Sequence, residues 1–460
     1  MVPDRLRPLL AEVQPLADRF AADGKRLYLV GGIVRDQLLG KPLADDGDID
    51  CTTDARPADI KRLVKGWADA VWTQGERFGT IGCRHGGRDF EITTHRAEVY
   101  TPESRKPDVV YSDVIEADLS RRDFTVNAMA LAVPDLELID PFGGAADLAA
   151  GVLRTPLQPE ESFTDDPLRM LRAARFIAGY GLKPDADLVA AVEHLGDRLA
   201  IVSAERIRDE LDKLLVTVDP SPGLWFLVDT GLVDHFLPEL PAMRLEQDPI
   251  HRHKDVLHHT IAVVAKTRPE RLVRLAALLH DVGKPRTRAI GEGGVSFHHH
   301  EVVGARMARD RMRALKYPND DVDAVSRLVY LHLRFHTYQM GWTDSAVRRF
   351  VRDAGPLLSE LIELTRCDCT TRNVRKAETL SRRMDELEAR IVELEAEEEL
   401  RSIRPDLDGQ QVMDHLGIPP SRAVGQALDA LLEIRLEEGP LGEEEAYRRL
   451  DAWWADQRSN

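Results

Sequence analysis

Two aspartates in the segment Gly47-Asp-Ile-Asp50 have the spacing that most directly suggests chemistry. We expect residues 46–52 to form a strand, in which positions two apart project from the same face. Two carboxylates on one face suit Mg²⁺, a hard cation that prefers oxygen ligands and completes its shell with substrate phosphates. Asp48 and Asp50 are therefore candidate catalytic residues of a two-metal nucleotidyl-transfer site. Glu91 is a candidate third carboxylate, although a solvent-facing strand residue fits it equally well.

A strand, a double glycine and a helix lie just before these aspartates. Leu27–Val30 is a short apolar run, Gly31-Gly32 follows it, and Ile33–Leu39 has helical character. Glycines let a backbone come close to a phosphate, and the N–H groups of a new helix favour an anion. A lone pair of glycines is more often an ordinary tight turn, so the phosphate hypothesis depends on the aspartates nearby.

The following segments predict a small α/β domain and then a helical body. Pro57 opens a helix, and short strands are expected at 70–72, 80–84 and 88–93. Residues 97–118 contain two prolines and several charges, which indicates a mobile surface loop. From about residue 163 nearly all patterns are helical. The predicted fold class is therefore an α/β head with a small mixed sheet, followed by a long all-α body.

Two groups of arginines are candidates for binding phosphates. Arg121 and Arg122 are expected to begin a helix, and arginine forks match triphosphate oxygens in a bidentate way. A pair of solvated arginines beside acidic neighbours is the alternative. Farther along, Pro167 starts a helix after two capping aspartates, Asp165 and Asp166. This helix carries an arginine every three residues, for which a salt-bridged exposed face is the common explanation: Arg169, Arg172 and Arg175.

Histidines and aspartates recur on separate predicted helices between residues 251 and 370. A buried helix, Leu272–Leu279, delivers the adjacent pair His280-Asp281. Histidine nitrogen together with carboxylate suits Zn, Mn, Fe or Ni. A lone histidine is more often a satisfied structural residue, but ligand types spread over several helices are hard to explain in that way. The candidate ligands beyond this pair are His259, His300, His332 and Asp368.

Length and composition limit the remaining possibilities. The chain has 460 residues, so we expect several domains. Its net charge of −17 argues against a broad basic surface for nucleic acid but leaves room for a local basic groove. No apolar run approaches the roughly 20 residues of a membrane helix, and the N-terminus lacks a signal-peptide pattern. With four cysteines in no metal-site spacing, we expect a cytoplasmic protein without a membrane partner.

Residues 375–400 form a long predicted helix with an apolar seam. The seam favours an intramolecular helical hairpin over a dimer contact, and the sequence leaves the oligomeric state open. A small helical tail follows. The seam residues, three or four apart, are Leu380, Met384, Leu387, Ile391 and Leu394.

The motifs, in this order, resemble those of the class II CCA-adding tRNA nucleotidyltransferases. These enzymes belong to the polymerase-beta-like superfamily together with bacterial poly(A) polymerases, and the resemblance covers most of the chain. Gly31-Gly32-x-x-Arg35-Asp36 is similar to the phosphate-binding turn of the family, and Asp48-Ile-Asp50 to its metal-binding pair. Arg121-Arg122-Asp123-Phe-Thr-Val-Asn127-Ala is similar to its ribose and triphosphate motif. Asp165-Asp166-Pro-Leu-Arg169, continuing to Arg172 and Arg175, is similar to its nucleotide-templating helix, with Asp165 where the family usually has Glu.

The resemblance implies a reaction and its partners. Asp166 and Arg169 would present donors and acceptors to the base of CTP and then ATP, so that protein replaces a nucleic-acid template. Asp48 and Asp50 would hold Mg²⁺, which activates the 3′-hydroxyl of tRNA and stabilises the leaving pyrophosphate. The segment 97–118 matches the loop that the family uses in switching from C to A addition. Full CCA addition is therefore expected, with A-only or poly(A) addition as the alternative.

The segment 251–370 resembles HD-domain phosphohydrolases. His259, His280, Asp281 and Asp368 match the metal-binding set, and His300 and His332 are plausible extra ligands. A divalent transition metal such as Mn, Ni, Co, Zn or Fe could bind there, and the domain could hydrolyse a 2′,3′-cyclic phosphate or a phosphomonoester on RNA. An inactive domain that forms part of the tRNA-binding body is the alternative, and the complete set of four core ligands favours a site that binds metal. This hydrolysis could also be the main activity, with the head as a binding module, or the protein could be a non-enzymatic RNA-binding scaffold.

The motifs also suggest domain boundaries. A nucleotidyltransferase head is expected at 1–150, and a helical templating and RNA-binding neck at 151–245. The HD domain would occupy 246–375, and a helical hairpin and tail would occupy 376–460.

Overall fold

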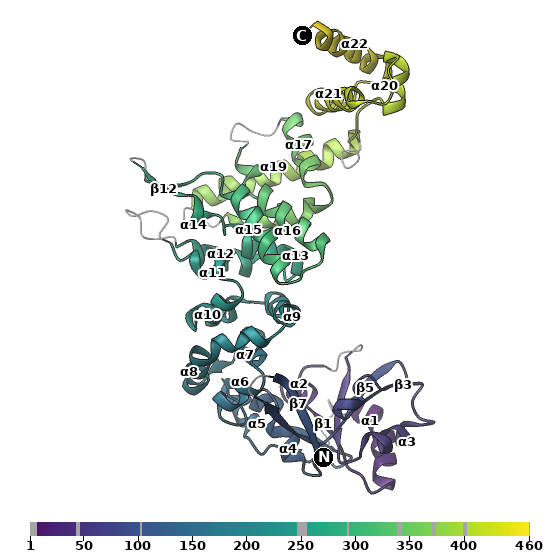
Figure 1. Cartoon of the computed structure of the whole chain (residues 1–460), viewed down its shortest axis with the longest axis vertical. Coiled ribbons are helices and arrows are strands. Elements are labelled where there is room, and N and C mark those ends of the chain that lie inside the picture. The colour runs from purple at the N-terminus through teal and green to yellow at the C-terminus, as the bar shows by residue number, and fades with distance from the viewer. Residues whose placement is uncertain are drawn as a thin grey trace. The chain divides into compact units, whose positions relative to one another are not determined.

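A computed structural model describes eight ranges of the chain, which form two compact units, 1–238 and 239–460 (Figure 1). The N-terminal unit holds the sheet, and the C-terminal unit is almost entirely helical. The described ranges are 7–42, 47–101, 104–245, 255–291, 294–337, 343–369, 374–398 and 403–459.

A sheet of seven strands is the scaffold of the N-terminal unit in the part of the chain described. Its strand order is β3-β4-β5-β2-β1-β8-β9, and β2 runs parallel to β5 while the other neighbours are antiparallel. The sheet is therefore mixed, as expected from the sequence. The strands are β1 (Leu27–Val30), β2 (Ile49–Thr53), β3 (Ala70–Trp72), β4 (Thr80–His85), β5 (Arg88–Thr94), β8 (Ala130–Val133) and β9 (Leu138–Ile139).

Helices α1 (Arg7–Ala22) and α3 (Pro57–Val64) cover one face of this sheet and build its main core. Alternate residues of the strands, such as Ile49, Cys51 and Phe90, point into that core. The residues between them project from the opposite face, because side chains alternate along a strand. Asp50 and Glu91 therefore share the face that is free of α1 and α3.

Two sequence predictions for residues 97–122 are wrong. Residues 97–118 are not a loop but strands β6 (Arg96–Thr101) and β7 (Ser104–Tyr111), paired in a hairpin, and then helix α4 (Ile115–Ser120). Arg121 and Arg122 do not begin a helix either, because they follow the last residue of α4 and precede a short 3₁₀ turn, Thr125–Asn127.

The remainder of this unit is helical apart from β10 (Val152–Leu153) and β11 (Lys183–Pro184), a short parallel pair. Helix α7 contacts α9 and α10 on one side. Asp165 is the last residue of α6 and does not cap α7, although Pro167 does precede α7 as expected. The helices are α2 (Gly32–Leu38), α5 (Gly144–Ala150), α6 (Pro159–Asp165), α7 (Leu168–Tyr180), α8 (Ala186–Leu195), α9 (Ala204–Leu215) and α10 (Ser221–Asp229).

The C-terminal unit packs its helices around α13, which contacts α12, α16 and α18. A small hairpin, β12 (Arg288–Gly291) and β13 (Gly294–Phe297), interrupts the otherwise helical order. The helices before the long helix are α11 (Glu239–Ala242), α12 (Val256–Lys266), α13 (Arg271–Leu279), α14 (Lys284–Thr287), α15 (His300–Ala314), α16 (Asn319–Leu331), α17 (Asp344–Ala354) and α18 (Leu358–Asp368).

The long predicted helix is α19 (Val374–Glu398), and its seam packs within the same unit against α17 and α18. Met384, Leu387 and Leu394 are buried there, so the intramolecular hypothesis is confirmed. The tail helices are α20 (Gly409–Leu416), α21 (Arg422–Glu438) and α22 (Glu443–Ser459), which share a small core. None of the helices in the described ranges is long and apolar enough to span a membrane.

Candidate functional sites

The turn after β1 brings the backbone close to a guanidinium group. Gly31 has φ +74°, which side-chain-bearing residues rarely adopt, and a Cβ there would lie 2.9 Å from Nη1 of Arg122. Glycine is therefore required both by backbone conformation and by the approach of Arg122. The following helix, α2, carries Arg35, which is buried and hydrogen-bonded to Asn127 Oδ1 at 2.5 Å. The predicted turn is thus present, with an arginine above it.

Three carboxylates face solvent beside this turn. Asp50 and Glu91 are paired residues of the parallel strands β2 and β5, and Asp48 directly precedes β2. Burial raises the pKa of Asp50, Asp48 raises it further, and Arg122 opposes the shift. The pKa of Glu91 is raised by burial and then by the charges of Asp50 and Asp48.

This carboxylate cluster suits a cation. No described side chain forms a hydrogen bond or ion pair with Asp48, Asp50 or Glu91. Their oxygens do not all converge within 4.8 Å, so they form no closed protein cage. An open pair of carboxylates is the usual arrangement for Mg²⁺, since substrate phosphates and water supply the remaining ligands.

Arg121 and Arg122 are both anchored by one buried carboxylate. Asp118 is fully buried and accepts hydrogen bonds from Arg121 at 2.7 Å and from Arg122 at 3.2 Å. Burial alone would raise the pKa of Asp118, but the two guanidinium charges outweigh it and lower the pKa to about 2. Both guanidinium groups therefore have a carboxylate partner within the protein. This partner, Asp118, orients both arginines and was not among the predicted site residues.

The arginine row on α7 also meets carboxylates. Asp123 accepts a hydrogen bond from Nε of Arg172 at 2.8 Å and from Asn127 at 2.9 Å. Glu210 on α9 is buried and accepts from Arg175 at 2.8 Å, with Arg172 3.8 Å away. Burial alone would raise the pKa of Asp123, but the charge of Arg172 and hydrogen bonds hold it well below its usual range.

Arg169 and Asp166, the predicted base-reading residues, have local partners. Arg169 is buried and donates to Ser162 Oγ at 2.8 Å and to the backbone carbonyl of Arg121. Asp166 accepts from the backbone N–H of Leu168 at 3.2 Å and lies 3.3 Å from Arg206 of α9. Nothing in local sequence spacing indicated Arg206 or Glu210, because both come from a helix about 40 residues farther along the chain.

All six predicted ligands of the C-terminal unit come together, from five helices and their ends. His259 lies on α12, His280 and Asp281 follow α13, His300 begins α15, His332 follows α16, and Asp368 ends α18. Their ligand atoms form two groups, each within 4.8 Å: His259, His280 and Asp368 in one, and Asp281, His300 and His332 in the other.

Backbone carbonyls aim three of these histidines. Nδ1 of His280, His300 and His332 lies 2.8, 2.7 and 2.6 Å from the carbonyl of the residue three positions earlier. A hydrogen bond to a carbonyl requires the proton on Nδ1, so Nε2 keeps its lone pair. A hydrogen bond from one ring nitrogen to a carbonyl, which fixes the orientation of the ring, is typical of histidines that bind metal through the other nitrogen. The donor set therefore fits a transition metal.

Asp281 lies between the two groups. Its Oδ2 is 3.2 Å from Nε2 of His280, and its Oδ1 is 3.4 Å from Nε2 of His300. Gly283 makes this approach possible, because a Cβ there would lie 2.2 Å from the carbonyl oxygen of His300. Lys284 donates to Asp281 at 2.6 Å and supplies the nearest lysine charge. The two groups are thus halves of one centre that Asp281 joins.

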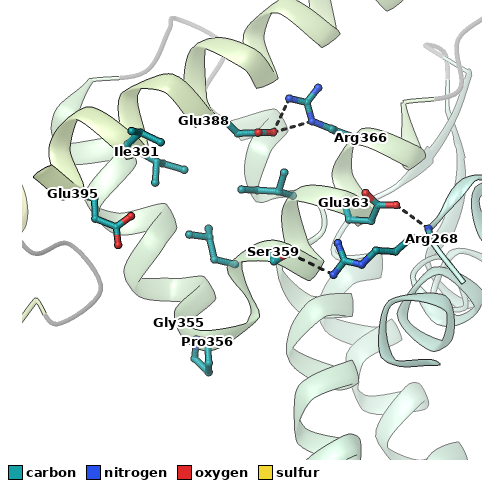
Figure 2. A pocket seen from close by; sticks show the side chains of 12 residues that line it. Arg268, Gly355, Pro356, Ser359, Glu363, Arg366, Glu388, Ile391 and Glu395 are labelled. Carbon is teal, nitrogen blue, oxygen red and sulfur yellow. Dashed lines mark hydrogen bonds and ion pairs between the residues drawn. The ribbon is translucent and has the colours of Figure 1, made fainter. Parts of the chain in front are cut away.

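A separate pocket of about 500 Å³ lies between α18 and α19 (Figure 2). Its arginines already have partners: Arg366 lies 2.6 Å from Glu388, and Arg268 donates through its backbone N–H to Glu363 and through its side chain to Ser359. None of the predicted site residues lines this pocket. Because its cations are paired locally, it offers little spare charge for a phosphate.

Family models match most of the chain in the expected order. Residues 27–154 match the poly A polymerase head domain, 181–243 the probable RNA and SrmB-binding site of polymerase A, and 256–394 the HD domain. Enzymes built from such head and HD domains are generally metal-dependent, in agreement with the two carboxylate-containing sites.

One relative matches almost end to end. The A-adding tRNA nucleotidyltransferase of Deinococcus radiodurans is 35% identical over 444 residues, which are 93% of this chain and 95% of that protein. The CCA-adding enzyme of Latilactobacillus sakei is 39% identical over 234 residues, or 51% of this chain and 57% of that protein. The chain thus spans about half the length of the curated CCA-adding relatives it matches.

A solved structure shares the whole fold. The CCA-adding enzyme of Bacillus stearothermophilus in complex with CTP superposes with a TM-score of 0.71 at 24% identity and covers 100% of both chains. This confirms the predicted fold class of an α/β head followed by a helical body. On the end-to-end relative and the three domain matches together, the chain belongs to the tRNA nucleotidyltransferase family and carries an HD domain behind the head.

Proposed function

We propose that this nucleotidyltransferase adds CCA to the 3′ end of tRNA from CTP and ATP and releases pyrophosphate. The observation that carries the proposal is the pairing of Asp50 with Glu91 on the open sheet face, beside the glycine turn and Arg122. Relatives named CCA-adding enzymes, and solved relatives in complexes with CTP, ATP and tRNA, support the same reaction. Since tRNA is the proposed substrate, we place the enzyme in the cytoplasm.

In this proposal different residues contact different parts of the nucleotide. Asp48 and Asp50, with Glu91 beside them, would hold Mg²⁺, which lowers the charge on the phosphates and favours the alkoxide form of the attacking 3′-hydroxyl. The 3′-oxygen forms a bond to the α-phosphorus while the bond to pyrophosphate breaks. The phosphate and ribose contacts fall to Gly31, Gly32, Arg35, Arg121, Arg122, Asp123 and Asn127.

Base selection is assigned to the start of α7. Asp166 is half-buried, and its carboxylate accepts from the backbone N–H of Leu168 and from Arg206, whereas Arg169 is held by Ser162 and the Arg121 carbonyl. Arg172 and Arg175 stiffen the same helix through Asp123 and Glu210. This division places residues 1–150 as the catalytic head, 151–245 as the templating neck, 246–375 as the HD domain and 376–460 as the hairpin and tail.

A-only addition is a second candidate, because the relative that matches end to end is an A-adding enzyme. The test is extension of tRNA transcripts that end at the discriminator base, at C or at CC, with CTP and ATP alone and together. CCA addition predicts two C residues from CTP alone and a final A only after CC. Addition of A to CC combined with no use of CTP would establish the A-adding function, and a long A tail would establish poly(A) synthesis.

We also propose that the HD centre hydrolyses a phosphoester at an RNA end, such as a 2′,3′-cyclic phosphate. The position of Asp281 between two ligand groups favours this, since paired metals can stabilise the attacking and leaving oxygens together. Hydrolysis should survive Asp48→Ala and disappear in Asp281→Ala. No turnover of cyclic-phosphate RNA with Mn²⁺, Ni²⁺ or Co²⁺ would leave the centre without a hydrolytic role.

A further inference from the structure

One face of α7 packs along its whole length against the part of the N-terminal unit that holds the seven-stranded sheet, which we call the sheet domain. Arg169, Arg172, Phe176 and Tyr180 are three or four residues apart, so they share that face. Each contacts a different residue of the sheet domain. The partners, in the same order, are the carbonyl of Arg121, the carboxylate of Asp123, the ring of Phe124 at 5.2 Å between centroids, and the guanidinium of Arg35.

Tyr180 is the last residue of α7, and its contact is with the phosphate turn. Its hydroxyl accepts a hydrogen bond from Nη2 of Arg35. Its ring lies 4.1 Å from the guanidinium carbon of Arg35 and 4.3 Å from Nζ of Lys41, as in cation–π pairs. Phe176 stacks on the Tyr180 ring, with centroids 5.2 Å apart. The tyrosine is therefore fixed by both its hydroxyl and its ring.

These contacts form a closed cycle of side-chain interactions that starts and ends on α7. Arg35 joins Tyr180 to Asn127, Asn127 donates to Asp123, and Asp123 accepts from Arg172. Arg172 and Tyr180 are eight residues apart, about 12 Å along the helix axis. This closed cycle opposes sliding or rotation of α7 against the sheet domain, because either movement breaks contacts at both ends of the helix. The turn that carries Gly31 and the helix that follows Asp166 thus have a fixed separation.

We propose that Tyr180 is a positioning residue that sets this separation, so that the choice of nucleotide depends on it. The inference rests on the proposed function, in which the glycine turn holds the triphosphate and the start of α7 reads the base. Base readout needs hydrogen bonds of about 2.7–3.2 Å, which a shift of 1 Å abolishes. Tyr180 has no contact with the nucleotide in this proposal and acts through Arg35.

The test compares Tyr180→Phe and Tyr180→Leu with the wild type. Single-nucleotide incorporation of CTP, UTP and ATP is measured on tRNA ending at the discriminator base, together with the thermal midpoint. We expect Tyr180→Leu to reduce the preference for CTP over UTP about tenfold and to raise KM for CTP, since misplacement weakens readout. Tyr180→Phe keeps the ring but lacks the hydroxyl, and it should reduce the preference only about threefold. Tyr330→Leu, at a tyrosine that is 52% exposed in the C-terminal unit, is the matched control.

A folded Tyr180→Leu enzyme with unchanged CTP preference would overturn the proposal. So would an equal loss with every nucleotide, which indicates a purely structural role. If the leucine variant does not fold, Tyr180→Phe decides by the same criterion, with a loss of about threefold expected for the missing hydroxyl. A wild-type enzyme that incorporates no nucleotide rejects the proposed function instead. In that case the role of Tyr180 is decided by calorimetry: the ratio of the Kd values for CTP and UTP is compared between the wild type and Tyr180→Leu.

Discussion

Asp50 on β2 is the direct strand partner of Glu91 on β5, and the two carboxylates face the same open surface. Parallel strands lie about 4.8 Å apart, so the two side chains are close enough to repel one another. Burial raises the pKa of both groups; the charge of Asp50 adds to the shift at Glu91, and the charge of Asp48 adds to the shift at both. A bound cation would relieve the repulsion between the carboxylates. We therefore expect these residues to bind metal even before the substrate binds.

Asp50→Asn should reduce nucleotide incorporation by about 10³-fold or more, the loss typical of removing one key electrostatic group. Glu91→Gln should cost less, because Glu91 supports the pair from the neighbouring strand. Incorporation of CTP on tRNA at saturating Mg²⁺ measures both. Asp89→Asn is the control, since Asp89 lies on the same strand but is bound to Arg84 at 2.5 Å. Wild-type rates in Asp50→Asn would remove this residue from the metal role.

Asp118 should make the stability of the N-terminal unit depend on pH in acid. Its folded pKa, about 2, lies below the ordinary 3.8, so its contribution is complete above pH 4 and is lost as pH falls towards 2. A shift of this size corresponds to about 2 kcal/mol. Asp118→Asn should therefore lower the unfolding free energy at pH 7 and flatten its acid dependence, as measured by urea unfolding. Asp113→Asn, at an exposed ion pair with Arg56, should change neither.

Arg172→Ala should destabilise the protein by about 3–5 kcal/mol, because it leaves the buried carboxylate of Asp123 unpaired. Asp123→Asn combined with Arg172→Met should cost less than the sum of the single changes. Chemical unfolding of the four proteins of this cycle measures the coupling. Arg208→Ala, at a surface pair with Asp209, is the control and should cost well under 1 kcal/mol. Strict additivity of the two changes would contradict the geometry.

The HD centre should bind two metal ions per chain. Dialysis against Mn²⁺ or Ni²⁺ followed by elemental analysis should give two equivalents for the wild type and one for His300→Ala. Asp281→Ala should lose both, because this aspartate contributes an oxygen to each group. His299→Ala is a matched control, since that side chain is 83% exposed and belongs to neither ligand group. One equivalent in the wild type would show that the second group is structural.

The sequence predicted those features that depend on local periodicity. A strand through Asp50 was predicted correctly, although β2 begins one residue after Asp48, and the apolar run before His280 placed this residue at the end of a helix. The hairpin at 96–111 was missed because its prolines and charges have the composition of a loop. The partners Asp118, Glu210 and Tyr180 could not be predicted from spacing, since their roles depend on which elements meet in space.

The hydrogen bonds from the histidine Nδ1 atoms to carbonyls three residues earlier have a consequence for assembly. Each of these rings is oriented by its own local backbone, so no partner helix is needed to turn it towards the centre. What the tertiary structure adds is only the distance between rings. Metal affinity therefore reports how tightly α12, α13, α15, α16 and α18 are packed. The spectrum of Co²⁺ bound at this centre would therefore report whether the C-terminal unit is folded.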